Sequence, residues 1–108
     1  MGHGYAVIYD IIGEIVVWNK ETGVFVWELR PDIKRYEVLD PSRSSLTGHD
    51  QPALHEVASW YEEFWTSGEP LPLANGLYAG PGQRLEVLKV KLDDERLQVT
   101  LRPLGVGN

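Results

Sequence analysis

The sequence contains no cysteine, a single methionine and no long run of apolar residues. Without cysteine the chain forms no disulfide, thiolate zinc site or cysteine nucleophile, and this composition favours a cytoplasmic location. A helix that crosses a bilayer needs about 20 consecutive apolar residues, so we expect no membrane-spanning helix. The first residues, Met1 to Gly4, also lack the basic and apolar regions of a signal peptide.

Positive charge is scarce as well. The chain has 10 Lys and Arg against 16 Asp and Glu, which gives a net charge of −6. No Lys or Arg occurs between Arg43 and Arg84, where five acidic residues lie. Binding to nucleic acid or to an anionic membrane needs a basic face, so neither partner is expected. The anionic middle of the chain favours a cationic partner instead.

The remaining composition is that of a globular protein. Apolar residues make up 43% of the 108 residues and charged residues 24%, close to the average of folded domains. We find no internal repeat, linker or low-complexity segment. The sequence therefore predicts one domain over residues 1–108.

The first 40 residues have the composition of a strand meander. Segments rich in β-branched and aromatic residues predict four strands, at residues 5–12, 15–18, 24–30 and 33–39. Gly13 is expected to allow a bulge or tight bend between the first two. Asn19 to Gly23 is typical of a hairpin loop, with Gly23 available for a positive φ.

The middle of the chain predicts one helix, over residues 52–67, that ends at Gly68. Its core-facing stripe is formed by residues three and four apart, namely Leu54, Val57, Ala58, Tyr61, Phe64 and Trp65. Asp50 is expected to cap the helix and Pro52 fits its first turn.

A segment rich in Gly and Pro follows, from Gly68 to Gly82. Its apolar residues indicate packing, so we expect Leu73, Leu77 or Tyr78 to be partly buried. The C-terminal part predicts a hairpin of strands 84–92 and 96–102, the second with alternating apolar residues that point inward.

Together these elements predict the α+β class. The expected architecture is a curled, mainly antiparallel sheet of about six strands, made of a meander and a C-terminal hairpin and packed on a single helix. An open barrel capped by the helix is the alternative. The absence of βα alternation argues against a doubly wound fold.

Residues suited to catalysis or metal binding occur, but not in a convincing arrangement. His49, Asp50, His55 and Glu56 are ligand types that suit zinc, yet the two histidines are six residues apart and do not share a helix face. Serines precede His49 without a nucleophile-elbow motif, and Gly76 to Gly82 lacks the lysine of a phosphate loop. We therefore assign no catalytic residue, no metal site and no cofactor.

Aromatic residues are the most informative feature. Four Trp and five Tyr are many for so small a core, and aromatic side chains dominate the energetics of protein interfaces. Trp60 lies off the apolar stripe of the helix, beside acidic residues. The predicted binding residues are the aromatic Trp27, Trp60 and Tyr78 and the acidic Glu56 and Glu63.

The sequence therefore favours a non-enzymatic protein-binding or assembly module. It would present an aromatic and acidic surface to another protein or to its own copy, as a two-fold dimer. The dimer is expected because Ile15 to Trp18 and Val24 to Trp27 are apolar on both faces, and one helix is too narrow to cover six strands. One alternative is a small-molecule-binding domain, with a pocket between sheet and helix lidded by residues 68–82. The other is a small enzyme that uses His49, Asp50 or His55.

Overall fold

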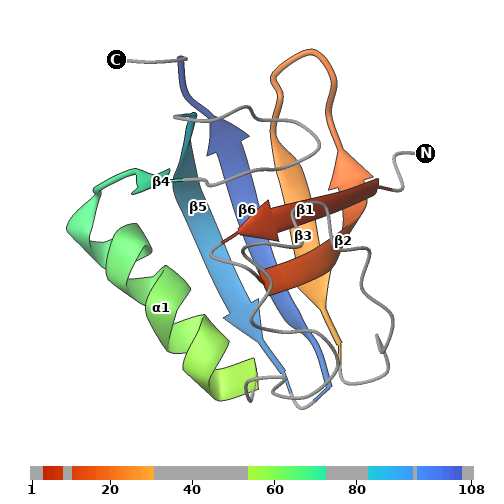
Figure 1. Ribbon diagram of the computed structural model, residues 1–108, viewed down its shortest axis with the longest axis vertical. Coiled ribbons are helices and arrows are strands. Elements are labelled where there is room, and N and C mark those ends of the chain that lie inside the picture. Colours follow the sequence, from red (N-terminus) through yellow and green to blue (C-terminus); the bar gives the residue numbers. More distant parts are fainter. Residues whose placement is uncertain (1–3, 9–10, 31–53, 73–82, 94, 106–108) are drawn as a thin grey trace, which may run out of the picture.

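The computed structural model describes residues 4–8, 11–30, 54–72, 83–93 and 95–105. Its elements, in chain order, are β1 (Gly4–Ile8), β2 (Ile11–Trp18), β3 (Phe25–Leu29), α1 (Leu54–Ser67), β4 (Leu71–Pro72), β5 (Arg84–Leu92) and β6 (Leu97–Pro103). Figure 1 shows α1 alongside β5, with β1 crossing in front of the central strands in that view.

The strands form one sheet in the order β1-β2-β3-β6-β5-β4, and every neighbouring pair is antiparallel. The expected class is confirmed, since one helix packs on an antiparallel sheet. In the described part of the chain β1 and β4 lie at opposite edges and do not pair with each other. The sheet is therefore open and is not a closed barrel.

The predicted strand boundaries need two corrections at the N-terminal end. Residues 5–12 do not form one strand, because β1 ends at Ile8 and β2 begins at Ile11. Gly13 does not bend the chain between strands but lies within β2, opposite Ala6 of β1. The strand predicted at 33–39 lies outside the described residues, and the sixth strand of the sheet is the two-residue β4.

The hairpin loop between β2 and β3 is confirmed. The Asn19 side-chain Oδ1 accepts hydrogen bonds from the backbone N–H of Glu21 at 3.0 Å and of Thr22 at 3.3 Å. Gly23 takes a φ of 81° and donates its N–H to the Asn19 carbonyl at 2.8 Å. An asparagine that bonds its own backbone and a glycine at positive φ together close the turn.

The register of the sheet shifts in the β5–β6 pair, between Val87 and Lys89, and in the β2–β3 pair. Ile15 pairs with Trp27, whereas Val17 pairs with Val26, so Val16 is an extra residue on β2. A bulge of this kind changes the face to which the following residues point. Because of it, Val17 shares a face with Val26 rather than with Trp27.

On the face of the sheet that carries Trp27, called here the inner face, α1 packs mainly against β5 and reaches Trp27 through Tyr61. Buried side chains from helix and sheet form one cluster, composed of Ile15, Phe25, Trp27, Leu29, Val57, Ala58, Tyr61, Leu71, Leu85, Val87, Leu97, Val99 and Leu101. The alternation predicted for β6 is confirmed, since Leu97, Val99 and Leu101 are all fully buried. Among the described residues no helix has the length and apolarity that crossing a membrane requires.

The predicted helix stripe is confirmed over most of its length. Val57 and Tyr61 are buried and Phe64 packs partly against the cluster, but Trp65, expected in the stripe, is 47% exposed. Periodicity predicts which side of the helix faces the sheet, but it does not predict how far along the helix the sheet extends. Trp65 can therefore lie in the stripe and still be exposed. The helix ends as predicted, with Gly68 at a φ of 75° and its N–H bonded to the Phe64 carbonyl at 3.0 Å.

Trp27 lies at the centre of the core, between the backbone of β2 and the helix. A Cβ atom placed on Gly13 would lie 2.2 Å from Cε2 of the Trp27 indole. On its other side the indole meets the Tyr61 ring of α1, with ring centroids 5.5 Å apart and the planes inclined by 41°. Glycine is therefore required at position 13 because the indole occupies the space of a side chain.

We expect Gly13→Ala to lower the free energy of unfolding by about 3 kcal/mol, because the added methyl group overpacks the core. Chemical denaturation of the purified variants measures this. Gly68→Ala is the control, since a Cβ there meets nothing within 4 Å and only the positive φ costs about 1 kcal/mol. In a Trp27→Leu background Gly13→Ala should cost less than in the wild type. An equal cost in both backgrounds would show that the indole does not occupy this space.

Candidate functional site

Trp27, one of the predicted binding residues, is 0% exposed and belongs to the core. A fully buried side chain cannot contact a partner, so the structure corrects the prediction that Trp27 belongs to the binding surface. Phe25 and Ile15 are buried with it on the inner face. Of the residues from which a two-fold dimer was expected, Ile15, Phe25 and Trp27 are thus covered within the chain, whereas Val17 and Trp18 stay exposed.

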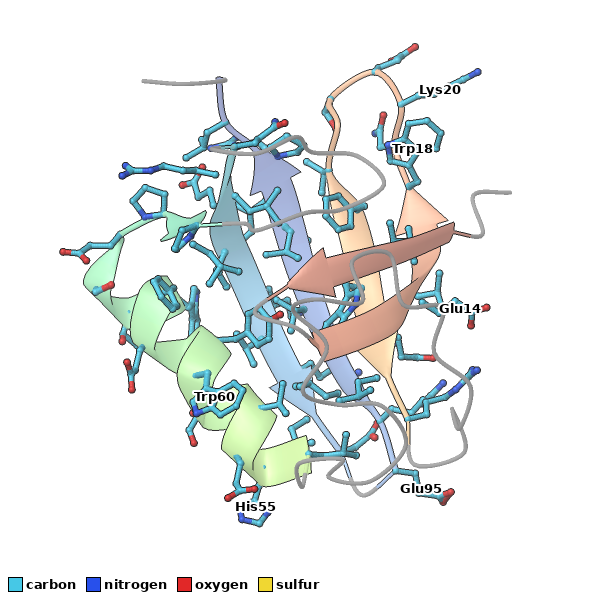
Figure 2. The ribbon with its side chains drawn as sticks, in the orientation of Figure 1. Glu14, Trp18, Lys20, His55, Trp60 and Glu95 are labelled. Atoms are coloured by element: carbon cyan, nitrogen blue, oxygen red, sulfur yellow. The ribbon has the colours of Figure 1, made fainter. Side chains whose placement is uncertain are left out.

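Trp60, Glu56 and Glu63 are exposed together on α1. Trp60 is 43% exposed, and the two glutamates lie four residues before and three residues after it, which places all three on one side of the helix. The core-facing residues Val57 and Tyr61 point the other way, toward the sheet. We call Glu56, Trp60 and Glu63 the Trp60 surface, and Figure 2 labels its central residue.

The Trp60 surface carries negative charge. Glu56 lies in the first turn of α1, and the helix contains no Lys or Arg. The nearest cation along the chain on the C-terminal side is Arg84. Trp60 is therefore a large, partly apolar side chain set between two carboxylates, the composition of a surface that takes a cationic partner.

The serine and threonine hydroxyl groups of α1 bond the helix itself. Ser59 donates to the His55 carbonyl at 3.1 Å, and Thr66 donates to the Glu62 carbonyl at 2.8 Å. Such bonds to the preceding turn occupy the hydroxyl proton. Neither hydroxyl is bonded to a histidine side chain that could act as its base, so the described helix does not present a nucleophile with its base.

The other candidates for chemistry are only partly described. His55 is exposed in the first turn of α1, with Glu56 beside it. Within the described ranges no three His, Asp or Glu residues are grouped closely enough to hold a metal ion. His49, Asp50 and Tyr78, together with Leu73 and Leu77, lie outside the described residues. The expectations for these five residues stay predictions.

The second candidate surface lies on the outer face of the sheet, opposite α1. The register brings residues of four strands, β2, β3, β6 and β5, into two cross-strand rows. The valine row consists of Val17, Val26, Thr100 and Lys89. The glutamate row consists of Glu14, Glu28, Gln98 and Lys91.

The valine row has an exposed apolar residue at one end and positive charge at the other. Val17 is 58% exposed, the most exposed of the large apolar residues described, and Val26 and Thr100 are half-buried. Lys89 and Lys91 end the two rows on β5, and both are exposed. Neither lysine forms an ion pair with any residue that the structure describes.

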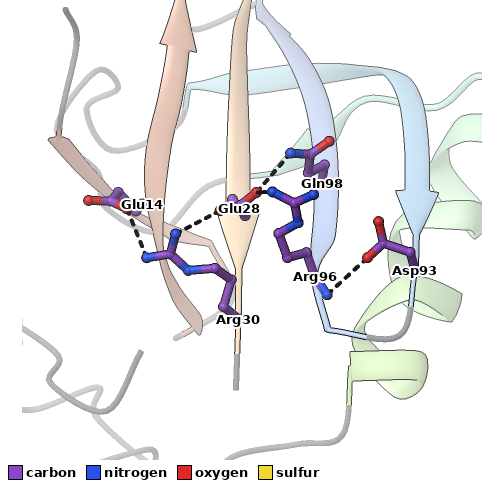
Figure 3. Close-up of polar contacts among 6 residues, drawn as sticks. All are labelled: Glu14, Glu28, Arg30, Asp93, Arg96 and Gln98. Carbon is purple, nitrogen blue, oxygen red and sulfur yellow. Dashed lines mark hydrogen bonds and ion pairs between the residues drawn. The ribbon is translucent and has the colours of Figure 1, made fainter. Parts of the chain in front are cut away.

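A charge network is built around Glu28 in the glutamate row (Figure 3). The Glu28 side chain is only 3% exposed. Its Oε1 accepts a hydrogen bond from Arg30 Nη1 at 3.2 Å, and its Oε2 accepts one from Gln98 Nε2 at 2.7 Å. Arg96 Nη1 lies 3.9 Å from Oε2, and Arg30 Nη2 also bonds Glu14 at 3.3 Å.

This network balances two carboxylates with two guanidinium groups, and it joins β2, β3 and β6. A buried carboxylate is tolerated when cations and hydrogen-bond donors surround it. The network is therefore a structural part of the outer face, and Lys89 and Lys91 are the charges of the two rows that form no ion pair with a described residue.

The outer face was missed by reading the sequence. If the pairing of Trp18 with Phe25 continued along the hairpin without a bulge, Glu28 would pair with Ile15 and Glu14 with Leu29. The bulge at Val16 pairs Glu14 with Glu28 instead. The available signal was the spacing of Lys89 and Lys91, which places both on one face of a strand.

The space between α1 and the sheet is filled in the described part of the chain. Trp27, Tyr61, Val57 and Leu85 are all within 1% of complete burial and belong to one packed cluster. The pocket expected between sheet and helix would therefore need residues outside the described ranges to form it.

Comparison of the chain with known protein families, with curated proteins and with solved structures gives no match.

We expect Glu28→Ala to lower the free energy of unfolding by about 2 kcal/mol, because Gln98 and the two arginines lose their buried acceptor. Glu86→Ala is the matched control: it removes a carboxylate paired with Arg102 at the surface, which should cost about 0.5 kcal/mol. Urea titration measures both. Equal losses in the two variants would contradict the structural role of Glu28.

Proposed function

We propose that this protein is a non-enzymatic protein-binding module and that the Trp60 surface of α1 is where it meets its partner. The observation that carries the proposal is the exposure of Trp60, at 43%, between Glu56 and Glu63. Tryptophan is more often an energetically important residue of a protein interface than most other residue types are.

The chemistry of the surface determines the kind of partner. Two carboxylates one turn before and after an indole attract a cation, and the ring face adds a favourable contact with Lys or Arg. Exposed ion pairs contribute only about 0–1 kcal/mol each, so affinity comes mainly from burying Trp60 and the charges select the partner. The partner is accordingly a protein surface with basic residues around an apolar patch. The absence of cysteine suits a module that works in the cytoplasm.

The proposal is preferred to the two alternatives on the basis of the described residues. A small-molecule site between α1 and the sheet finds that space occupied by Trp27, Tyr61 and Val57. An enzyme based on His55 has at hand only an exposed imidazole, with the helix hydroxyls bonded to their own backbone. Neither alternative explains why Trp60 is outside the core.

The direct test replaces Trp60 with a photo-reactive phenylalanine analogue and irradiates the protein in cells. Captured proteins are identified, and the affinity of each purified candidate for the original protein is then measured by calorimetry. We expect Glu56→Gln/Glu63→Gln to weaken binding by up to about 10-fold and Trp60→Ser by more, because the indole supplies the buried area.

The matched control is Glu62→Gln/Glu95→Gln, which removes two exposed carboxylates elsewhere and should leave the affinity unchanged. The proposal fails if both double variants bind equally well. It also fails if the analogue placed at Glu95, an exposed residue between β5 and β6, captures the same proteins with the same yield.

A further inference from the structure

We infer that the partner of the Trp60 surface is a second copy of this chain, docked head to tail on the valine row and on Lys89 and Lys91 of the outer face. This inference rests on the proposed function, since it names the occupant of the same surface. Both halves of the interface are formed by described residues of one chain, the anionic half on α1 and the cationic half on β5.

The chemistry of the two surfaces is complementary. The Trp60 surface offers one large aromatic side chain flanked by carboxylates. The outer face offers the exposed Val17 and the half-buried Val26 and Thr100, in a row that ends at Lys89. Lys89 and Lys91 make no ion pair with described residues. Trp60 packed on Val26 and Thr100 would bring its neighbouring carboxylates toward these two lysines.

The dimensions also agree. Glu56 and Glu63 are separated by about 10 Å along a helix, and Lys89 and Lys91 by about 7 Å along a strand, a difference that long lysine side chains span. A helix is roughly 10 Å across and covers about two strands. A helix laid on the outer face of a sheet whose inner face is already covered completes a three-layer arrangement.

The two surfaces point in opposite directions. The exposed side of α1 faces away from the sheet, because Val57 and Tyr61 face toward it, and the valine row lies on the other side of the same sheet. Figure 2 shows Trp60 on the helix at one side of the molecule. Two copies cannot satisfy both surfaces around a two-fold axis, so association proceeds head to tail into longer assemblies.

The experiment measures molar mass by light scattering from about 10 µM to about 1 mM protein, the range suited to weak association. The wild-type mass should rise above 12.2 kDa with concentration and pass twice that value. Two charge-reversal variants, Glu56→Lys/Glu63→Lys and Lys89→Glu/Lys91→Glu, should each remain at 12.2 kDa. All four positions are exposed, so circular dichroism should show both variants folded.

The decisive sample is an equimolar mixture of the two variants. The lysines introduced on α1 of one variant are complementary to the glutamates introduced on β5 of the other, and the two unchanged surfaces also remain complementary. The mixture should therefore regain the wild-type mass increase. The control Glu62→Lys/Glu95→Lys changes the net charge as much as Glu56→Lys/Glu63→Lys does, and it should associate as the wild type does.

Several results would overturn the inference. A wild-type mass of 12.2 kDa at every concentration, a mass that stops at a dimer, or a mixture that stays monomeric would each do so. Binding of a single-stranded oligonucleotide to monomeric protein, lost in Lys89→Glu/Lys91→Glu, would assign the lysines to a different partner. If the wild type is monomeric but cross-linking through position 60 captures another protein, the proposed function stands and only this inference fails.

Discussion

The fold depends on one close contact, in which the indole of Trp27 occupies the space beside Gly13 and packs against the ring of Tyr61. This contact joins the N-terminal strands to the helix, which are far apart in the sequence. Indole and phenol rings inclined to each other at 5.5 Å bury a large apolar area. With the indole in this position, β2 needs a glycine and α1 must present Tyr61 to the sheet.

The same contact separates the two sides of the molecule. Because Val57 and Tyr61 pack toward the sheet, Glu56, Trp60 and Glu63 are left on the exposed side of the helix. On the sheet, the bulge at Val16 sends Val17 to the outer face, where it continues the row toward Lys89. The helix side is consequently acidic and aromatic, while the outer face combines valine, a charge network centred on Glu28 and two exposed lysines. A small acidic protein thus carries two surfaces of opposite character.

Periodicity in the sequence predicted the class, the helix with its buried stripe, the Asn19–Gly23 loop and the alternation of β6, because each depends on local residue spacing. It also separated Trp60 from the stripe. Periodicity could not predict the register of the strands or which face of the sheet is covered. The bulge at Val16, which alone pairs Glu14 with Glu28, depends on long-range packing. The sequence placed Trp27 on a surface because an apolar strand looks the same whether its neighbour is a second molecule or the chain's own helix.

Trp27 holds the core together, whereas Trp60 is exposed and, as we propose, available to a partner. Nuclear magnetic resonance of the four indole N–H groups, with a soluble paramagnetic gadolinium chelate added to dilute protein, tests this difference most directly. The Trp27 signal should remain sharp and exchange slowly with deuterium, whereas the Trp60 signal should broaden strongly, together with those of Trp18 and Trp65. Broadening of all four signals to the same extent, or protection of Trp60 in dilute protein, would contradict the account.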